Sequence, residues 1–438
     1  MRAAAPLLLV HVGLLLAFDP RRHLLLVLLV CALGFVALGW AVRRLAVRPP
    51  AAREALLVAA VLRLLLLPLP PTLSDDLGRY LWDGRVAMSG NNPYALPPSA
   101  PELEPLRDDL WRRLPHREVP TIYPPLALAA FSIASRLPGA ALLLKAAFVA
   151  ADLLACALLL RLAAARGTPP SRVLWYAWNP LVAFEVAAMG HVEPVGIAAC
   201  LAATLALVRR PPRPGLAGAA AAAAALAKLA PAAALPMWAR QSRRPALFVA
   251  LALGLLACGL GPIVAASGGV PPGLVVYGVR WEFDGPLFEP LWRLLAWARA
   301  DVAGKRALDA LEARLGDWQA LDAVYPWVYP QLLAKLGLAA AGLVAIGLSL
   351  RERDPIAGTG RLFGRLLLVS ATVHPWYVLW ILPWAALCAQ PAWIALSGLV
   401  LLSYLAAEGA APLWPWIYLA VWLPFFALLL WRPRWSSA

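Results

Sequence analysis

A short polar segment over residues 74–85 carries the side chains best suited to chemistry. Its polar residues of interest are Asp75, Asp76, Arg79, Tyr80, Asp83 and Arg85. In a helix that begins here, Asp75, Arg79 and Asp83 would share one face. One of the two adjacent carboxylates could then accept a proton from a hydroxyl group. The alternative is that both aspartates only cap the helix, with Arg79 as an ordinary partner one turn later.

Two further polar strings are turns or interfacial segments. Tyr123 lies in a proline-rich turn, and with Tyr94 it could present an aromatic face to a sugar ring. His191 and Glu193 are polar residues in an otherwise apolar neighbourhood. Two such ligands are too few to define a metal site, so no metal is predicted. The alternatives are that the first string only ends a loop and that the second is a polar turn.

Cationic and aromatic residues later in the chain are candidates to surround a phosphate. Lys228 is a lone cation in a long apolar stretch, and Pro231 follows it. An ammonium group supplies three donors to an anionic phosphate, although a lysine can also extend to the membrane interface. Arg280 lies in the second long loop, and His374 and Trp376 lie at a predicted helix break.

The elements that must position these residues are strongly apolar. Of the 438 residues, 62% are hydrophobic and only 14% are charged, whereas soluble domains carry about 25% charged residues. Several stretches reach the roughly 18 residues that span a bilayer as a helix. We predict an all-α polytopic membrane protein with about 11–13 transmembrane helices. The net charge of +15 comes largely from clusters beside apolar ends, which indicates the lipid bilayer as partner and argues against nucleic acid.

The order of spans and basic clusters divides the chain into parts. The predicted parts are N-terminal transmembrane helices (1–70), a long, partly helical first external loop with the acidic residues (71–125), and the remaining transmembrane region (126–438), which includes a second external loop near 268–295 and an amphipathic segment at 299–325. Polar residues or proline interrupt two apolar stretches, 216–238 and 362–387. Irregular backbone at membrane depth must be buried in protein or line a wet cavity, so we expect a cavity open to the external side.

Several of these strings resemble the GT-C membrane glycosyltransferases, in particular bacterial polyprenyl-phosphate-mannose-dependent mannosyltransferases. The likeness rests on Ser74–Arg85, Asn92-Pro-Tyr, Thr121–Leu126, Trp178-Asn-Pro-Leu, Gly190-His191, Lys228 with its following proline, and His374-Pro-Trp-Tyr. It implies a GT-C fold and an inverting transfer of one sugar, with mannose as the family-level expectation. Asp75 or Asp76 would be the catalytic acidic residue. Relatives often have Asn and Asp after the His of the Gly-His turn, whereas this chain has Val192-Glu193.

The resemblance also implies substrates and a location. The donor would be a polyprenyl-phosphate-linked sugar, the acceptor a glycolipid or glycan, and no cofactor would be required. The enzyme would lie in the inner (plasma) membrane with its active site on the external or periplasmic side. A transporter or flippase of lipid-linked sugars is the alternative, but the internal pseudo-symmetry that such transporters often show is not apparent. An assembly subunit with a degenerate site would tolerate Asp75→Ala and Asp76→Ala.

Overall fold

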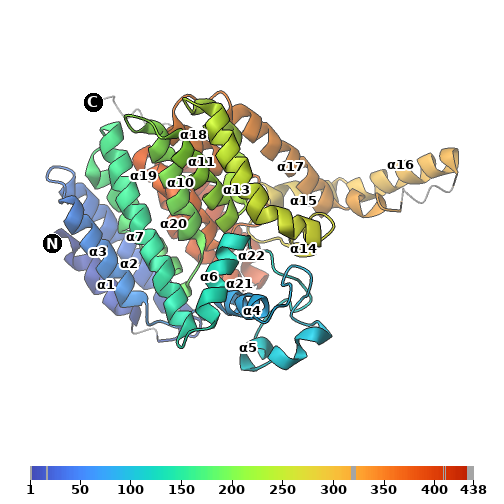
Figure 1. The fold of residues 1–438 in the computed structure, drawn as a ribbon, viewed down its shortest axis with the longest axis horizontal. Coiled ribbons are helices and arrows are strands. Elements are labelled where there is room, and N and C mark those ends of the chain that lie inside the picture. Colours follow the sequence, from blue (N-terminus) through green and yellow to red (C-terminus); the bar gives the residue numbers. More distant parts are fainter. Residues whose placement is uncertain (1, 16–17, 317–321, 408, 410, 432–438) are drawn as a thin grey trace.

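The computed structural model describes residues 2–15, 18–316, 322–407, 409 and 411–431, and these residues form a bundle of helices (Figure 1). Among these described residues, four helices are long and apolar enough to cross a membrane: α2 (Leu24–Leu45), α7 (Ala140–Arg166), α13 (Pro245–Ala266) and α17 (Pro330–Ser349). The shorter apolar helices are α1 (Ala5–Leu15), α6 (Pro125–Ser135), α9 (Pro180–Ala183) with the π-helix Phe184–Met189, α10 (Glu193–Val208), α11 (Pro214–Ala227), α20 (Pro391–Leu399) with α21 (Ser403–Ala407), and α22 (Trp414–Leu430). The predicted all-α polytopic membrane protein is confirmed.

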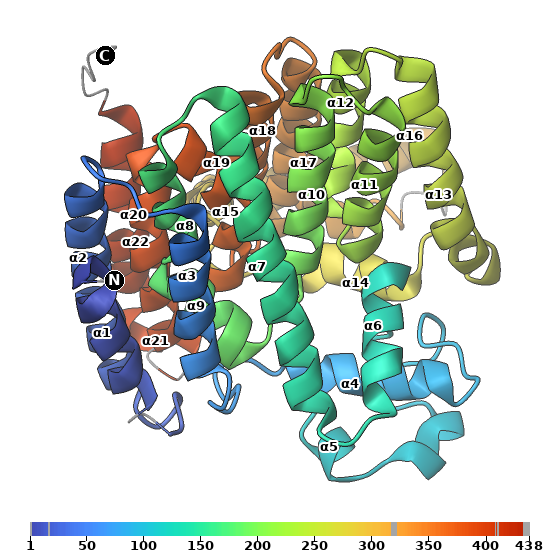
Figure 2. The same ribbon diagram turned by 60° about the vertical axis from the view of Figure 1, so that its left-hand side comes forward.

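The remaining helices complete the bundle or cover its ends. Those within it or at its upper end in Figure 2 are α3 (Ala52–Leu66), α8 (Leu174–Ala177), α12 (Leu235–Gln241), α18 (Pro355–Leu368) and α19 (Leu382–Leu387). At the lower end of Figure 2, α4 (Asp76–Met88) lies across the direction of α7 and α10, and α5 (Asp109–Arg112) lies beyond it. We call this lower end the α4 end.

Close packing against α6 fixes the position of α4. A Cβ atom on Gly84 would lie 2.4 Å from the carbonyl carbon and oxygen of Phe131, so only glycine permits this approach. On another side of α4, Trp82, Leu103 and Leu114 belong to a small hydrophobic core separate from that of the bundle. Helix α4 is therefore held firmly against the end of the bundle.

Both interrupted stretches are broken helices, as predicted. Helix α11 ends at Ala227, Lys228 has extended backbone (φ −154°, ψ 138°), and a 3-10 helix at Ala230–Ala234 leads into α12. Helix α18 ends at Leu368, and a second 3-10 helix, η8 (Pro375–Trp380), begins directly after His374. The two breaks place a lysine and a histidine where backbone leaves the regular helices.

The second long loop and the amphipathic segment also contain helices. They are α14 (Pro272–Arg280), α15 (Phe288–Trp297) and α16 (Ala300–Leu315). Helix α16 projects away from the bundle in Figure 1. The predicted segment 299–325 is thus helical over its first part, and its residues 317–321 lie outside the described residues. That it lies on a membrane surface stays a prediction.

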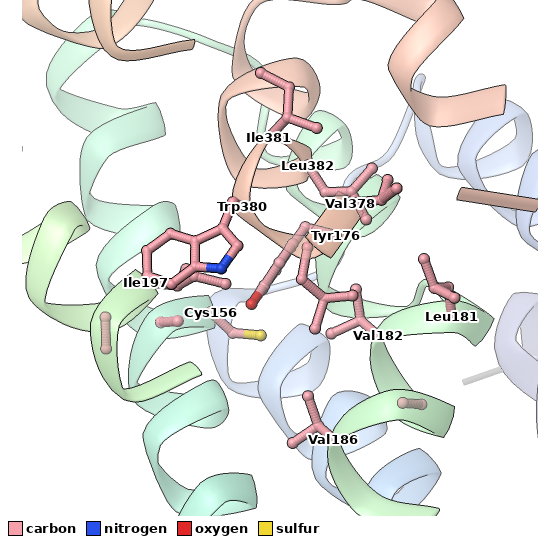
Figure 3. Close-up of a cluster of buried hydrophobic side chains, with 14 of the residues drawn as sticks. Cys156, Tyr176, Leu181, Val182, Val186, Ile197, Val378, Trp380, Ile381 and Leu382 are labelled. Carbon is pink, nitrogen blue, oxygen red and sulfur yellow. The ribbon is translucent and has the colours of Figure 1, made fainter. Parts of the chain in front are cut away.

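A large hydrophobic core lies between the N-terminal and C-terminal helices. Figure 3 shows part of it, in which side chains from α7, α8, α9, the π-helix, α10 and η8 meet. Trp380 reaches this core because residue 196 is glycine: a Cβ atom there would lie 2.5 Å from the Trp380 ring. The same Trp380 also lines the cavity described below. The core therefore supports one wall of the candidate site.

A buried ion pair joins α3, α7 and the segment around α8. Arg63 Nε lies 2.5 Å from Asp152 Oδ2, and both side chains are fully buried. Tyr176 donates a hydrogen bond of 2.6 Å to the other oxygen of Asp152, and Arg63 donates to the Ala177 carbonyl oxygen at 2.7 Å. Since each charged group has several partners, the apolar surroundings can accommodate both charges.

Removing the carboxylate of this pair is predicted to destabilise the bundle. Asp152→Ala leaves the Arg63 charge buried without its counter-ion, which costs about 3–5 kcal/mol. Tyr176→Phe removes one hydrogen bond to a charged group and costs about 1.5–3 kcal/mol. Thermal unfolding of the purified protein in detergent measures both effects. An Asp152→Ala protein as stable as the wild type would contradict this role for the ion pair.

Candidate active site

A cavity of about 730 Å³ opens at the α4 end of the bundle. Its walls come from the start of α4, the loop over residues 115–124, the break after α11, helix α14, the end of α18, and η8. Segments from both halves of the chain thus meet at one cavity. Among the predicted site residues, those that line it are Asp75, Asp76, Arg79, Tyr123, Lys228, His374 and Trp376.

The two adjacent aspartates have different surroundings. Asp75 is exposed and its side chain caps no backbone N–H group of α4. Asp76 is half-buried, and its Oδ2 accepts a hydrogen bond from the Tyr80 hydroxyl at 3.3 Å and lies 3.5 Å from Nδ1 of His191. Ser74 Oγ accepts a hydrogen bond from the backbone N–H of Asp76. These contacts favour Asp76 over Asp75 as the reactive carboxylate and argue against the capping alternative.

Asp76 is held in its ionised form. Burial in the cavity wall acts to raise the pKa of this carboxyl, but the contact with His191 and the positive charges of His191 and Lys228 outweigh it. The pKa of Asp76 therefore lies below its ordinary value. At neutral pH the group is a carboxylate that can accept a proton.

Lys228 lies at the break after α11 and lines the same cavity as Asp76. Its Nζ is 2.6 Å from Oε1 of Glu193, and the lysine side chain is 22% exposed while the glutamate is fully buried. The ammonium group also lies 5.8 Å and 5.4 Å from the ring centres of Tyr123 and Tyr377. The Tyr377 hydroxyl is hydrogen-bonded to that of Tyr277. Lys228 is therefore held by protein contacts while part of it remains open to the cavity.

Four rings form a continuous stack beside the carboxylate. The ring centres of His191 and Trp376 are 3.9 Å apart, those of Trp376 and His374 are 4.5 Å apart, and those of His374 and Phe283 are 4.7 Å apart. Both faces of Trp376 are therefore covered, so it can offer only an edge to a substrate. Burial lowers the pKa of His374 to about 4, in spite of the nearby charge of Asp76. His374 is thus neutral at neutral pH and can donate only one hydrogen bond to a phosphate.

The loop that holds Phe283 is pinned to the last helices. Phe283 N–H donates to the Ala371 carbonyl, and Val373 N–H donates to the Phe283 carbonyl. The buried Asp284 accepts hydrogen bonds from Ser403 and, at 2.7 Å, from Trp422. Burial raises the pKa of Asp284 to about 7, although these hydrogen bonds act to lower it. This anchor fixes the outer end of the ring stack.

Arg79 lines the cavity, and the buried predicted residues Asp83, Tyr80, His191 and Glu193 lie behind its wall. Arg79, on the wall, pairs with the buried Asp83 at 2.8 Å and donates to the Val119 carbonyl at 2.6 Å, which ties α4 to the loop before α6. Tyr80 is buried and stacks on Phe131 with ring centres 4.3 Å apart. His191 and Glu193 are fully buried. His191 lies beside Asp76, whereas Glu193 pairs with Lys228, so the two residues do not act on a common partner.

Two predicted residues, Arg85 and Arg280, lie neither on the cavity wall nor directly behind it. Arg85 lies two turns beyond the start of α4 and pairs with Asp108 at 2.8 Å. Arg280 is exposed and is not part of the cavity wall. Leu274 and Tyr277 of α14 and Trp281 directly after it line the cavity, whereas the Arg280 side chain is exposed to solvent.

Several residues at the site were not predicted. Glu185 lies 3.3 Å from Nε2 of His191 and is fully buried. A single acidic residue within an apolar run is itself a signal of function, and it could have identified Glu185. His116 also lines the cavity, and its ring lies 4.6 Å from that of Trp281, between the two long loops. Its position depends on a contact between loops, for which the sequence gives no pattern.

Within the described residues, no group of three or more His, Cys, Asp or Glu side chains is arranged to hold a metal ion. The prediction that no metal is needed stays a prediction. The site combines an ionised carboxylate, an ammonium group and aromatic walls. Such a site can take a proton from a hydroxyl group near Asp76 and hold an anion near Lys228.

Loss of the Lys228 charge is predicted to weaken anion binding. Lys228→Gln should lower the affinity for a polyprenyl phosphate by about 10–100-fold, because a charge-assisted hydrogen bond is worth about 1.5–3 kcal/mol. Binding to the purified protein in detergent measures this. Lys335→Gln is the control, because Lys335 pairs with Glu282 at 3.0 Å and is not part of the cavity wall.

The same substitution leaves Glu193 buried without its cation, so stability must be measured separately. The double variant Lys228→Gln/Glu193→Gln removes the unpaired charge. It should recover thermal stability without recovering affinity for the phosphate. Equal affinity losses in Lys228→Gln and Lys335→Gln would contradict a phosphate role for Lys228.

Comparison with known proteins identifies the family. A family model described as "Alpha-(1->6)-mannopyranosyltransferase, N-terminal domain", of the MptA_B family, matches residues 2–242. The match covers more than half of the chain and includes Asp76, His191 and Lys228, whereas His374 lies beyond it. Searches of curated proteins and of solved structures found no match. The predicted resemblance to mannosyltransferases is confirmed, and the chain belongs to the MptA_B family of alpha-(1->6)-mannopyranosyltransferases.

Proposed function

We propose that this membrane mannosyltransferase has a GT-C architecture and transfers mannose from a polyprenyl phosphate to a glycolipid or glycan, with inversion. The observation that carries the proposal is the pairing, in one cavity, of the ionised Asp76 with the partly open ammonium group of Lys228. A glycosyl phosphate donor needs a cation for its leaving group, and an acceptor hydroxyl needs a base.

The proposed reaction is a single displacement. The acceptor hydroxyl loses its proton to Asp76 while its oxygen forms a bond to C1 of mannose. The bond between C1 and the phosphate oxygen breaks, and its electron pair leaves with the polyprenyl phosphate. Lys228 stabilises the charge that develops on this leaving group. Because the acceptor attacks on the side opposite the phosphate, the configuration at C1 is inverted.

The inner walls of the cavity suit a lipid-linked donor. Phe363, Leu366 and Leu367 of α18, together with Trp380 of η8, line the cavity with apolar surface. A polyprenyl chain extending from a phosphate at Lys228 could lie against these side chains and leave for the bilayer. This arrangement favours a lipid phosphate over a water-soluble nucleotide sugar as donor.

The distribution of basic residues supports an external site. The clusters Arg209–Arg213, Arg243–Arg244 and Arg351–Arg353 lie near the upper ends of α10, α13, α17 and α18 in Figure 2, opposite the α4 end. Basic loops favour the cytoplasmic side of a membrane. With those ends in the cytoplasm, α4 and the cavity face the external side of the inner membrane.

Sugar transfer by the purified protein tests the proposal. Wild type, Asp76→Asn and Asp75→Asn are each given polyprenyl phosphate mannose and a mannoside acceptor in detergent. Loss of a general base is expected to slow transfer by Asp76→Asn about 10²–10⁴-fold. Asp75→Asn is the matched control, since its side chain is exposed, and it should retain transfer within a few-fold. A wild type that transfers nothing, or an Asp75→Asn protein slower than Asp76→Asn, would contradict the proposal.

Transfer is also expected to be independent of divalent ions. A chelator such as EDTA should leave the initial rate of the wild type unchanged, because Lys228 supplies the positive charge at the leaving group. Loss of the rate in chelator, with recovery on adding a divalent ion, would show that a metal performs this task.

A further inference from the structure

His191 connects the proposed base to a second buried carboxylate. Its ring is fully buried, with Nδ1 3.5 Å from Asp76 Oδ2 and Nε2 3.3 Å from Glu185 Oε2. Glu185 is fully buried too, and both of its oxygens accept from the Tyr404 hydroxyl, at 3.0 Å and 3.1 Å. The result is a chain of polar groups in the order Asp76, His191, Glu185 and Tyr404, in which His191 and Glu185 are buried between two residues that line the cavity.

An irregular backbone segment brings His191 and Glu185 together. Residues Phe184–Met189 form a π-helix, and Gly190 then adopts a left-handed conformation (φ +79°). The His191 backbone N–H donates to the Glu185 carbonyl at 3.1 Å. A Cβ atom on residue 190 would lie 2.8 Å from Lys145 Cγ. Both the turn and its packing therefore require glycine, and π-helical segments are frequent at functional sites.

The ring of His191 is prevented from turning away. Trp376 stacks on it at an interplanar angle of 16°, and His374 stacks on the other face of Trp376. One face of the ring is covered by Trp376, and each ring nitrogen lies within 3.5 Å of a carboxylate oxygen. Such restraint is typical of residues that hold a reactive group in place.

We propose that His191 and Glu185 are positioning residues for Asp76, with His191 holding Oδ2 so that Oδ1 is left to accept the acceptor proton. This inference rests on the proposed function. Tyr80 binds the same Oδ2, and no hydrogen bond or ion pair found among the described residues involves Oδ1. Glu185, on the far side of the ring, stabilises the positive charge of His191.

The charges around His191 explain the energetic effect. The titratable groups around Asp76 and His191 come from several elements. They are Glu185, Tyr404, Tyr80, Tyr123, Lys228, Tyr277, Tyr377 and His374. Burial acts to lower the pKa of His191, but its contacts with Asp76 and Glu185 raise it to about 9. His191 is thus a cation at neutral pH, and its charge keeps the pKa of Asp76 low.

The pH dependence of kcat tests this role. The base must be ionised, so activity falls as the pH drops through the pKa of Asp76. His191→Gln removes the adjacent positive charge and raises that pKa. The acid limb of the kcat profile should therefore move to higher pH by about 1–3 units, while KM for the donor stays within a few-fold.

Glu185→Gln provides a second variant if His191→Gln fails to fold. His191 then loses its proton at a lower pH, so the change should appear on the alkaline side of the kcat profile, where activity should fall at a lower pH than in the wild type. Asp152→Asn is the matched control, because it removes an equally buried carboxylate that pairs with Arg63 and not with His191. It should lower thermal stability and leave both sides of the profile in place. An unshifted acid limb in His191→Gln together with an unshifted alkaline side in Glu185→Gln would overturn the positioning role.

A spectroscopic readout separates this inference from the proposed function. Infrared titration of the carboxyl band, with Asp76→Asn subtracted, reports the pKa of Asp76 without any sugar transfer. We expect this pKa to rise in His191→Gln by the same amount as the limb. If the wild type transfers no sugar but the spectroscopic pKa of Asp76 still rises in His191→Gln, the proposed reaction is refuted. The contact between His191 and Asp76 is then still supported. An unchanged spectroscopic pKa would refute the positioning role directly.

Discussion

An ionised side chain inside an apolar bundle needs an opposite charge or hydrogen-bond partners, and this constraint shapes the site. Two ionic pairings lie at the cavity. Asp76 lies next to His191, whose other nitrogen meets Glu185, and Lys228 lies next to Glu193. Each pairing leaves one group, Asp76 or Lys228, in contact with the cavity. The same constraint applies to Arg63 and Asp152, a fully buried pair that joins α3, α7 and the segment around α8.

Irregular backbone supplies the positions that regular helices cannot. The break after α11 presents Lys228, the break before η8 presents His374, and the π-helix with its left-handed glycine presents His191. The ring stack then joins His191 to Phe283 of the second long loop. The N-terminal part that matches the family therefore depends on C-terminal segments beyond the match to complete its site.

The sequence predicted the bundle, both broken helices and most of the charged residues that line the cavity, because charges and prolines are conspicuous in apolar stretches. The sequence could not decide which of Asp75 and Asp76 is the reactive carboxylate. Their side chains point in different directions only once the start of α4 is folded. Arg280 was expected near a phosphate, but its side chain is exposed to solvent and is not part of the cavity wall. Glu185 was overlooked because its partnership with His191 requires a π-helix, which no simple periodicity indicates.

The most direct test of the central claim is a cryo-EM structure of the protein with polyprenyl phosphate bound. The account predicts the phosphate within hydrogen-bonding distance of Lys228 Nζ, the lipid chain along α18, and Asp76 facing the space that C1 of the sugar would occupy. It also predicts that His191 keeps its contact with Asp76. A phosphate bound instead at Arg280, or at the upper end of the bundle away from Asp76, would contradict the account.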